Sequence, residues 1–256
     1  MIINLIPMAG EGKRFVDAGY RIAKPLIPVA GVPMILRAAR CLPTPDRWVF
    51  VCRREHLDSH HIDQVLHNSF RPLDIVPVDH STQGQACTCL IARPHLPPEA
   101  TLHIGACDNA MTYNTRKLDT LMASPDVDAI IWTFCKNPTV LQNPHMYGWV
   151  AVDPLGNVTH ISCKIPLSDQ PMNDHAVIGA FTFKRAAQFL SCADSMIAKN
   201  RRINGEFYVD EVMNIAVESG LRVKVFEVER YICWGTPRDL DVFQYWHGYF
   251  HDVGFV

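Results

Sequence analysis

The sequence predicts an α/β protein with a mixed, mostly parallel β-sheet and helices on both of its faces. Two observations predict it. Apolar runs alternate with helical stretches through the first half of the chain, which is typical of strand–helix–strand units and parallel pairing. The second half then changes to a hairpin followed by further strands and helices. With 256 residues, of which 48% are hydrophobic, the chain is long enough to bury a large core.

The elements of the first half follow from short apolar runs bounded by turn residues. The predicted buried strands are Ile2–Pro7, Trp48–Cys52, Leu73–Val78, Thr101–Ile104 and Asp128–Phe134. The predicted helices between them are Met34–Arg40, Gln85–Ala92 and Arg116–Met122.

The second half begins with the stretch YGWVAVDPLGNVTHIS, residues 147–162, which predicts a hairpin around its Pro-Leu-Gly-Asn turn. A final helix is expected to begin near Pro237, with Thr236 as its N-cap. No Gly/Ser linker or repeat interrupts the chain, so we expect one domain over residues 1–256. The remaining predicted elements are a strand at Ala176–Phe183, a helix after it, a helix at Val209–Glu218 and a strand at Val223–Val228.

Composition excludes several classes of partner. A formal net charge of -2 argues against nucleic acid or an anionic membrane surface as the main partner. No run approaches the roughly 20 apolar residues of a membrane span, and the first residues predict a strand and not a secretory leader. The nine cysteines show no C-x-x-C pair, so we expect reduced thiols in a cytoplasmic protein.

The loop after the first strand gathers glycines and cations. In open α/β sheets, ligands bind beyond the carboxyl ends of the strands. Gly10 and Gly12 allow backbone N–H groups to approach a ligand, and Lys13, Arg14 and Lys24 add positive charge. Backbone donors and cations together predict a phosphate site.

Two common phosphate loops are excluded here. A P-loop would need glycine where the chain has Pro7, and a dinucleotide fingerprint would need a third glycine at Phe15. The whole stretch, AGEGKRF followed by KPLIPVAGVPMI, instead resembles the signature of the sugar-phosphate nucleotidyltransferases, the nucleotide-sugar pyrophosphorylases, and of related cytidylyltransferases. Ala23 replaces a proline of that signature. The matching residues after it are Lys24, Pro25, Gly31, Pro33 and Met34.

The resemblance implies a Rossmann-like, GT-A-like nucleotidyltransferase fold. It divides the chain into a nucleotide-binding half at about 1–135 and an acceptor-binding half at about 136–256. The loop, from Ala9 through Gly10, Gly12 and Lys13, would wrap the phosphates of a nucleoside triphosphate. Arg14 and Lys24 would neutralise the pyrophosphate leaving group and the α-phosphate during in-line attack.

The stretch HSTQGQACTCLIA, residues 80–92, resembles the family's base-recognition turn. Gln83 and Gln85 offer amide groups for a base edge, and Gly84 allows a flat ring to approach the backbone. Since glutamine can read several base edges, the base is left open. The alternative is an ordinary helix start capped by Thr82 or Ser81.

Asp108 follows a predicted strand in HIGACDNAM, where the family has an aspartate that holds Mg²⁺. The alternative is an acid that only caps the next turn. In YICWGTPRDL, Cys233 stands where the family commonly has a second metal-binding aspartate. Thiolate is a poor ligand for Mg²⁺, so the second ligand is left open.

The resemblance also implies an acceptor site. Tyr147 and Gly148 match the family's glycine-containing strand, and Lys164 matches its lysine at the acceptor phosphate, although the glutamate that usually precedes that lysine is missing. Glu206 and Asp210 match a G-E-x-x-x-D segment near the acceptor. The alternative for Asp210 is a solvated acid in the first turn of a helix.

Other residues suggest less chemistry. The adjacent His60 and His61 cannot share one helix face, so a surface position is expected for them. His103, on an apolar strand, is expected to be buried and hydrogen-bonded. For the aromatic stretch FQYWHGYFHDVGFV, residues 243–256, a helix packed on the core is favoured over a subunit interface, which would imply a homo-oligomer.

The implied reaction is transfer of a nucleoside monophosphate from a triphosphate to a sugar 1-phosphate or similar phosphorylated acceptor, with release of pyrophosphate. Arg14, Lys24 and Lys164 would be the catalytic residues, with Mg²⁺ on Asp108. Two alternatives remain open. One is a cytidylyltransferase for a non-sugar phosphate or phosphonate, such as phosphocholine. The other is a nucleotide-binding regulatory protein that has lost catalysis.

Overall fold

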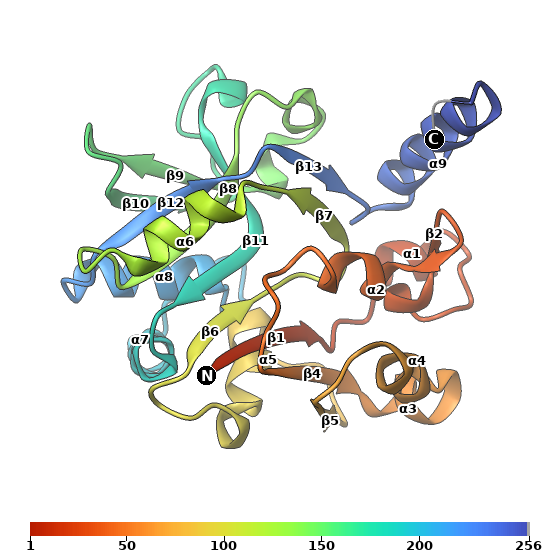
Figure 1. Ribbon diagram of the computed structural model, residues 1–256, viewed down its shortest axis with the longest axis horizontal. Coiled ribbons are helices and arrows are strands. Elements are labelled where there is room, and N and C mark those ends of the chain that lie inside the picture. The colour runs from red at the N-terminus through yellow and green to blue at the C-terminus, as the bar shows by residue number, and fades with distance from the viewer. Residues whose placement is uncertain (255–256) are drawn as a thin grey trace.

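A computed structural model describes residues 1–254. Its centre is a nine-stranded sheet in the order β10-β9-β11-β6-β1-β4-β5, with β8 and β12 joined to it through β11 (Figure 1). The strands are β1 Ile2–Met8, β4 Arg47–Arg53, β5 Leu73–Val78, β6 Thr101–Ile104, β8 Ala129–Phe134, β9 Gly148–Val152, β10 Val158–Cys163, β11 His175–Phe183 and β12 Val223–Glu227.

The strand directions confirm a mixed, mostly parallel sheet. β1 pairs in parallel with β4 and β6, β4 with β5, and β8 with β12. β11 is antiparallel to β6, β8 and β9, and β10 is antiparallel to β9. Only β10 and β11 therefore oppose the other strands of this sheet. Two short pairs lie outside it: β2 Pro28–Val29 with β3 Val32–Pro33, and β7 Asn109–Thr112 with β13 Arg230–Cys233.

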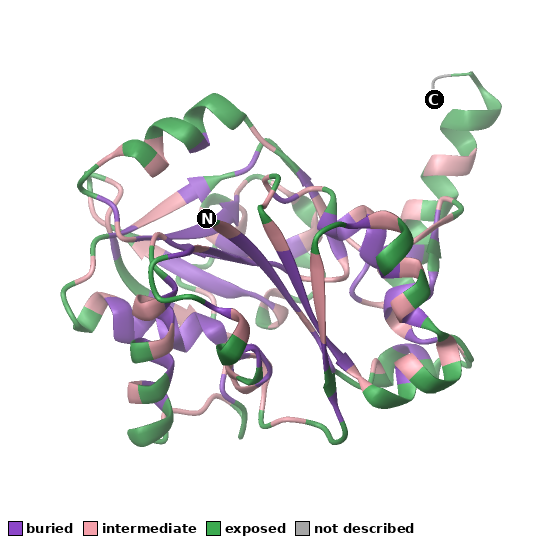
Figure 2. Ribbon diagram, turned by 60° about the horizontal axis from the view of Figure 1, so that its bottom comes forward, coloured by how far each residue is buried: buried purple, intermediate pink, exposed green. Residues whose placement is uncertain are grey.

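Helices cover both faces of the sheet, because successive strand residues point to opposite sides. Leu5 packs in the cluster under α5, α7 and α8, and Ile6 packs in the cluster under α2, α4 and α6. Figure 2 shows the buried strands between these layers. The α-helices are α1 Lys13–Asp17, α2 Met34–Ala39, α3 Arg54–His60, α4 Ile62–Ser69, α5 Gln85–Ile91, α6 Thr115–Ala123, α7 Ala186–Ala198, α8 Val209–Glu218 and α9 Pro237–Asp252. The 3₁₀-helices are η1 Lys24–Leu26, η2 Arg93–His95, η3 Pro138–Leu141, η4 Pro144–Met146 and η5 Pro171–Asn173.

The positions of three histidines agree with those expected from the sequence. His60 ends α3, and His61 follows it in the left-handed region, with φ of 49°. His103 is buried, and its Nδ1 lies 2.7 Å from the Thr182 hydroxyl. The hairpin is present as β9 and β10, whereas α3 and α4 were not indicated by the apolar pattern.

The C-terminal helix α9 corrects one expectation. Thr236 caps it as predicted, and Leu240 in its first turns is buried. Farther along, however, Tyr245 is 68% exposed and Trp246 51% exposed, because the helix projects away from the body (Figures 1 and 2). The favoured core packing of this aromatic stretch therefore holds for Phe243, which packs beside Trp234, and is wrong for the exposed aromatic residues after it. Its residues 255–256 lie outside the described residues.

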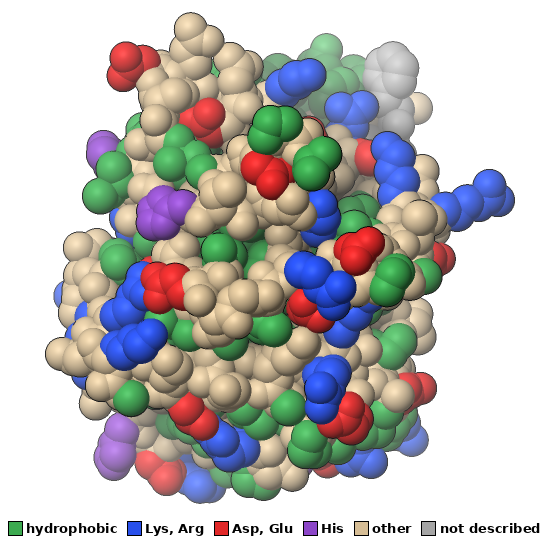
Figure 3. Space-filling model, turned by 90° about the vertical axis from the view of Figure 1, so that its left-hand side faces the viewer, with side chains coloured by type: hydrophobic (Ala, Val, Ile, Leu, Met, Phe, Trp, Pro, Cys, Tyr) green, Lys and Arg blue, Asp and Glu red, His purple; other side chains and the backbone are tan. Residues whose placement is uncertain are grey.

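The distribution of surface charge and the state of the cysteines agree with what the composition predicted. On the face shown in Figure 3, positive and negative side chains are interspersed. All nine cysteines are free thiols. Within residues 1–254, no helix combines the length and apolar character needed to cross a bilayer.

Candidate functional site

The glycine loop lines a cavity of about 520 Å³ at the carboxyl end of β1. Gly12, with φ of 65°, is the N-cap residue of α1, and the buried Phe15 anchors that short helix. The lining residues from the loop and its surroundings are Pro7, Ala9, Gly10, Glu11, Gly12, Lys13, Ser81, Thr82, Gly84, Gln85, Thr88 and Glu206. We name this the loop cavity.

The turn before α5 is fastened by backbone to the segment at Phe207. Gly84 has φ of 124°, and a Cβ there would lie 2.6 Å from both the backbone N and O of Phe207. The Phe207 N–H donates to the carbonyl of Gln83, and the Ala86 N–H donates to the carbonyl of Phe207. No side chain caps α5, so neither alternative cap residue is used. The glycine is needed here for both conformation and space.

The two glutamines of this turn take different positions. The Gln83 Oε1 accepts a hydrogen bond of 2.5 Å from Arg202, and this residue is not part of the cavity lining. Gln85 lines the loop cavity and also a second cavity beside it. Of the two amides expected at the site, only that of Gln85 therefore lines either cavity. Glu206, expected near the acceptor, lines the loop cavity instead.

Lys24 and Asp108 form an ion pair, in which Asp108 lines the second cavity and Lys24 lines neither of the two. Their Nζ and Oδ2 atoms are 2.5 Å apart, and both side chains are largely shielded from solvent. Burial favours the neutral amine, but the Asp108 carboxylate, together with Cys107 and Cys233, outweighs this effect, and the pKa of Lys24 is raised. Asp108 therefore does more than cap a turn: its charge is matched by the lysine of the signature loop.

Cys233 lies beside Asp108, as the order of the family motifs implied. A Cβ built on Gly235 would lie 3.2 Å from Cys233 Sγ and 3.3 Å from Asp108 Oδ2, so Gly235 leaves room for both groups. Burial, and then the Asp108 charge, raise the pKa of Cys233 to about 12. The Cys233 thiol donates to Asp239 Oδ2 at 3.7 Å, and the same carboxylate oxygen accepts a hydrogen bond from Thr236.

The second cavity, of about 240 Å³, lies between β9, β11 and the ends of β7 and β13. Lys164 lines it in a left-handed conformation, with φ of 67°. Its Nζ donates to the Met146 carbonyl at 2.5 Å and lies 5.4 Å from the centre of the Tyr208 ring. The other lining residues include Arg14, Asp108, Tyr147, Gly148, Gly179, Asp210, Tyr231 and Cys233. We name this the lysine cavity.

Asp210 is buried and not solvated, which corrects the alternative for its helix position. A Cβ on Gly148 would lie 2.0 Å from the Asp210 Oδ1, so this carboxylate fills the space that a side chain at 148 would take. Burial raises the pKa of Asp210, although the Lys164 charge opposes that shift. The next acid, Glu211, is also buried and pairs with Arg201.

Together the two cavities form a bipartite site. Gln85 belongs to both, and Arg14 reaches the lysine cavity from the loop that lines the other. One cavity offers glycine backbone and Lys13 to an anionic ligand, and the other offers Lys164 beside the buried Asp210 and the half-buried Asp108. Two tyrosines of the lining, Tyr208 and Tyr231, were not predicted. Only their positions next to predicted residues could have indicated them.

No family model matches the chain, and no curated protein matches it. Solved structures do. A nucleoside-diphosphate-sugar pyrophosphorylase from Vibrio cholerae RC9 has a TM-score of 0.73 at 19% identity, covering 94% of this chain and 98% of its own. The inositol-1-phosphate CTP transferase from T. maritima has a TM-score of 0.73 at 17% identity, covering 95% and 94%.

A Bacillus anthracis protein described as a glucose-1-phosphate thymidylyltransferase, in complex with a sucrose, is also similar. Its TM-score is 0.71 at 16% identity, and the match covers 96% of this chain and 94% of that one. The chain therefore has the Rossmann-like fold of these sugar-phosphate nucleotidyltransferases, as its sequence predicted.

Proposed function

We propose that the protein is a nucleotidyltransferase that moves a nucleoside monophosphate from a triphosphate to a sugar 1-phosphate or similar phosphorylated acceptor, releasing pyrophosphate. The observation that carries the proposal is the bipartite site, in which a glycine-lined cavity and a lysine-lined cavity adjoin at Gln85. The fold shared with enzymes named for this chemistry supports it.

The loop cavity is the proposed triphosphate site. Backbone N–H groups around Gly10 and Gly12 and the cation of Lys13 suit phosphate oxygens. Arg14, exposed on α1 and facing the lysine cavity, is placed to bridge the two ligands. Gln85 is the proposed contact to the base or sugar of the nucleotide, because it lies at the junction.

The lysine cavity is the proposed acceptor site. Lys164 would hold the acceptor's phosphate as a point charge, so that one of its oxygens attacks the α-phosphorus directly. No covalent enzyme intermediate is needed. Tyr147 and the backbone at Gly148 shape the wall, and Asp210 accepts hydrogen bonds from acceptor hydroxyls if it is ionised.

Mg²⁺ is the proposed cofactor, and Asp108 is the residue that would hold it. A single carboxylate is enough when phosphate oxygens and water supply the other ligands. The protonated thiol of Cys233 does not suit this ion. The ion would neutralise charge on the phosphates. Lys24, which pairs with Asp108 in the structure, would then be released to contact a phosphate oxygen.

The two alternative functions receive no specific support from the structure. The names of the similar structures state different bases and different acceptors, so the base and the acceptor of this protein are left to experiment. Free thiols suit a reducing compartment, and cytoplasmic localisation belongs to the proposal.

The test is a pyrophosphate-release assay with each of five triphosphates, ATP, CTP, GTP, UTP and dTTP, against a panel of sugar 1-phosphates, phosphocholine and inositol 1-phosphate, with and without Mg²⁺. We expect Mg²⁺-dependent turnover with one or two triphosphates. Lys24→Ala should lower turnover by at least about 100-fold, whereas the exposed Lys199→Ala should not change it. Absence of turnover together with absence of triphosphate binding would overturn the proposal.

A further inference from the structure

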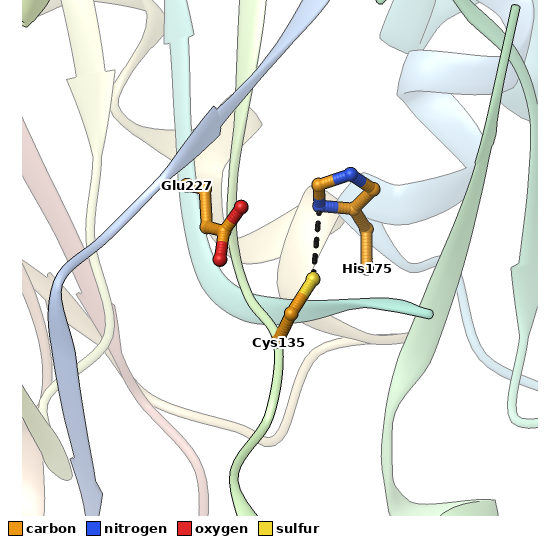
Figure 4. A group of neighbouring side chains, drawn as sticks. All are labelled: Cys135, His175 and Glu227. Carbon is orange, nitrogen blue, oxygen red and sulfur yellow. Dashed lines mark hydrogen bonds between the residues drawn. The ribbon is translucent and has the colours of Figure 1, made fainter. Parts of the chain in front are cut away.

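Three side chains of metal-binding type converge at one end of the sheet, away from the two cavities described above. Cys135 follows β8, His175 begins β11 and Glu227 ends β12. Since β11 runs antiparallel to β8 and β12 runs parallel to it, these three strand ends lie side by side. Figure 4 shows the thiol, the imidazole and the carboxylate turned toward a common point.

The distances suit a shared ion. One ligand atom from each residue lies within 4.8 Å of the others, and Cys135 Sγ is 3.4 Å from His175 Nδ1. A tetrahedral Zn²⁺ with bonds of about 2.3 Å to sulfur and about 2.0 Å to nitrogen would place those two atoms about 3.5 Å apart. The sulfur and the nitrogen therefore already have the separation that a common zinc ion requires.

The ligand set selects the metal. A thiolate, an imidazole and a carboxylate together suit Zn²⁺, and thiolate disfavours Mg²⁺ and Ca²⁺. Cys135 and His175 are half-buried while Glu227 is exposed, so an ion can enter from solvent and keep a water ligand. The charged groups that face the cluster are Glu227, Asp174 and Lys136, and two of these three are acidic.

A simple hydrogen bond explains the arrangement less well. His175 Nδ1 lies 3.1 Å from the Thr133 hydroxyl as well as 3.4 Å from the Cys135 thiol, and a neutral ring nitrogen has one donor or acceptor position for both. A disulfide is also excluded as the role of this thiol in the structure, because Cys135 is free. Neither explanation uses the carboxylate of Glu227.

We propose that Cys135, His175 and Glu227 bind a Zn²⁺ ion, with water in the fourth position. On binding, the thiol loses its proton to solvent, and the sulfur–zinc bond replaces the sulfur–hydrogen bond, so one proton is released for each ion bound through the thiol. This site is separate from the proposed Mg²⁺ position at Asp108, and its existence does not depend on the proposed function.

The site would fasten segments that build the lysine cavity. β11 continues from His175 into Val177–Gly179, which line that cavity. β12 continues from Glu227 into β13, which ends at Cys233. Next to Cys135, Phe134 stacks on Tyr231 of β13 at 4.2 Å. The ion therefore has a structural role, holding two walls of the cavity at a fixed separation.

The test uses the full-length protein after removal of any affinity tag. Metal is stripped with chelator, Co²⁺ is added as a spectroscopic probe for Zn²⁺, and Zn²⁺ content is measured after dialysis. We expect one equivalent of Co²⁺ with a thiolate-to-cobalt absorption band, displaced by Zn²⁺, and a higher midpoint of thermal unfolding with Zn²⁺ than without.

Variants assign the site. Cys135→Ser should abolish the thiolate band, whereas Cys87→Ser and Cys233→Ser should retain it. Glu227→Gln should weaken Zn²⁺ binding by at least about tenfold, and the exposed Glu229→Gln, two residues farther along, should not. Circular dichroism establishes that each variant is folded. A protein that binds no Co²⁺ through sulfur, or a Cys135→Ser variant with an unchanged band, would overturn the proposal.

Discussion

Replacing Gly148 by alanine tests whether the buried Asp210 carboxylate shapes the lysine cavity. The added Cβ would lie 2.0 Å from Asp210 Oδ1. Real Cβ atoms essentially never come closer than 3.0 Å to such a neighbour. The carboxylate must therefore move by at least about 1 Å, from 2.0 to 3.0 Å. Gly148 has no positive φ, so the effect comes from space and not from backbone conformation.

The magnitude follows from that displacement. A misplacement of about 1 Å in a catalytic site can cost about 100-fold in rate, and overpacking a core costs about 1–3 kcal/mol of stability. Gly148→Ala should therefore lower kcat/KM about 100-fold and lower the free energy of unfolding by about 1–3 kcal/mol. Steady-state pyrophosphate release measures the first, and denaturant unfolding measures the second.

The stability part can be refuted without knowledge of the substrate. In an Asp210→Ala background the clashing oxygen is absent, so Gly148→Ala should cost less there than in the wild type. Gly248→Ala, whose Cβ would meet open space in α9, is the control and should be neutral or stabilising. An equal cost of Gly148→Ala in both backgrounds would refute the steric reasoning.

Three further predictions concern stability. Gly84→Ala places a Cβ 2.6 Å from the Phe207 backbone at a φ of 124°, so the unfolding free energy should fall by more than about 2 kcal/mol in denaturant titration. Burial lowers the pKa of His103 from 6.5 to about 4, so the unfolded chain binds the extra proton in this range. Stability should then fall as the pH drops from 6.5 toward 4, by up to about 3 kcal/mol, and His103→Gln should remove that part of the slope. Asn214→Ala removes the two hydrogen bonds, of 2.8 and 2.9 Å, that the side chain makes to the backbone N–H and carbonyl of Ile161. The free energy of unfolding should fall by about 2–4 kcal/mol. An unchanged midpoint of denaturant unfolding would contradict a stabilising role for these bonds.

The sequence alone predicted those parts of the fold that are determined by residues close together in the chain. The buried strands were visible as apolar runs, and β5 and β6 have the predicted bounds, Leu73–Val78 and Thr101–Ile104. The cap at Thr236 depends only on its own helix, and it was predicted as well. The glycine loop likewise carried its signal within a few residues.

Side-chain direction at the site depended on distant chain. Gln83 and Gln85 have the same side chain, but a hydrogen bond from Arg202 holds Gln83 away from the two cavities. Asp210 had the position of a solvated helix-start acid, and it is buried because it occupies the space left by Gly148. Neither partner is near in sequence, so no local pattern could decide these cases.

In the terminal helix, the sequence pattern predicted burial where the structure shows exposure. Its aromatic residues have the composition of a core helix, and only the geometry of α9 leaves Tyr245 and Trp246 exposed. Contact with the body is concentrated in the first turns, where Leu240 and Phe243 join the cluster around Trp234 and Gln244 donates to the carbonyl of Pro28.

The position of β11 restricts how the molecule can move. This strand is hydrogen-bonded to β6 and β8 from the first half of the chain and to β9 from the second, so one continuous ladder crosses the whole sheet. A hinge between the two halves would have to break several of these backbone bonds at once, each at about 1 kcal/mol net. Domain opening of that kind is therefore disfavoured, and substrates would enter and products leave through rearrangement of the connecting loops.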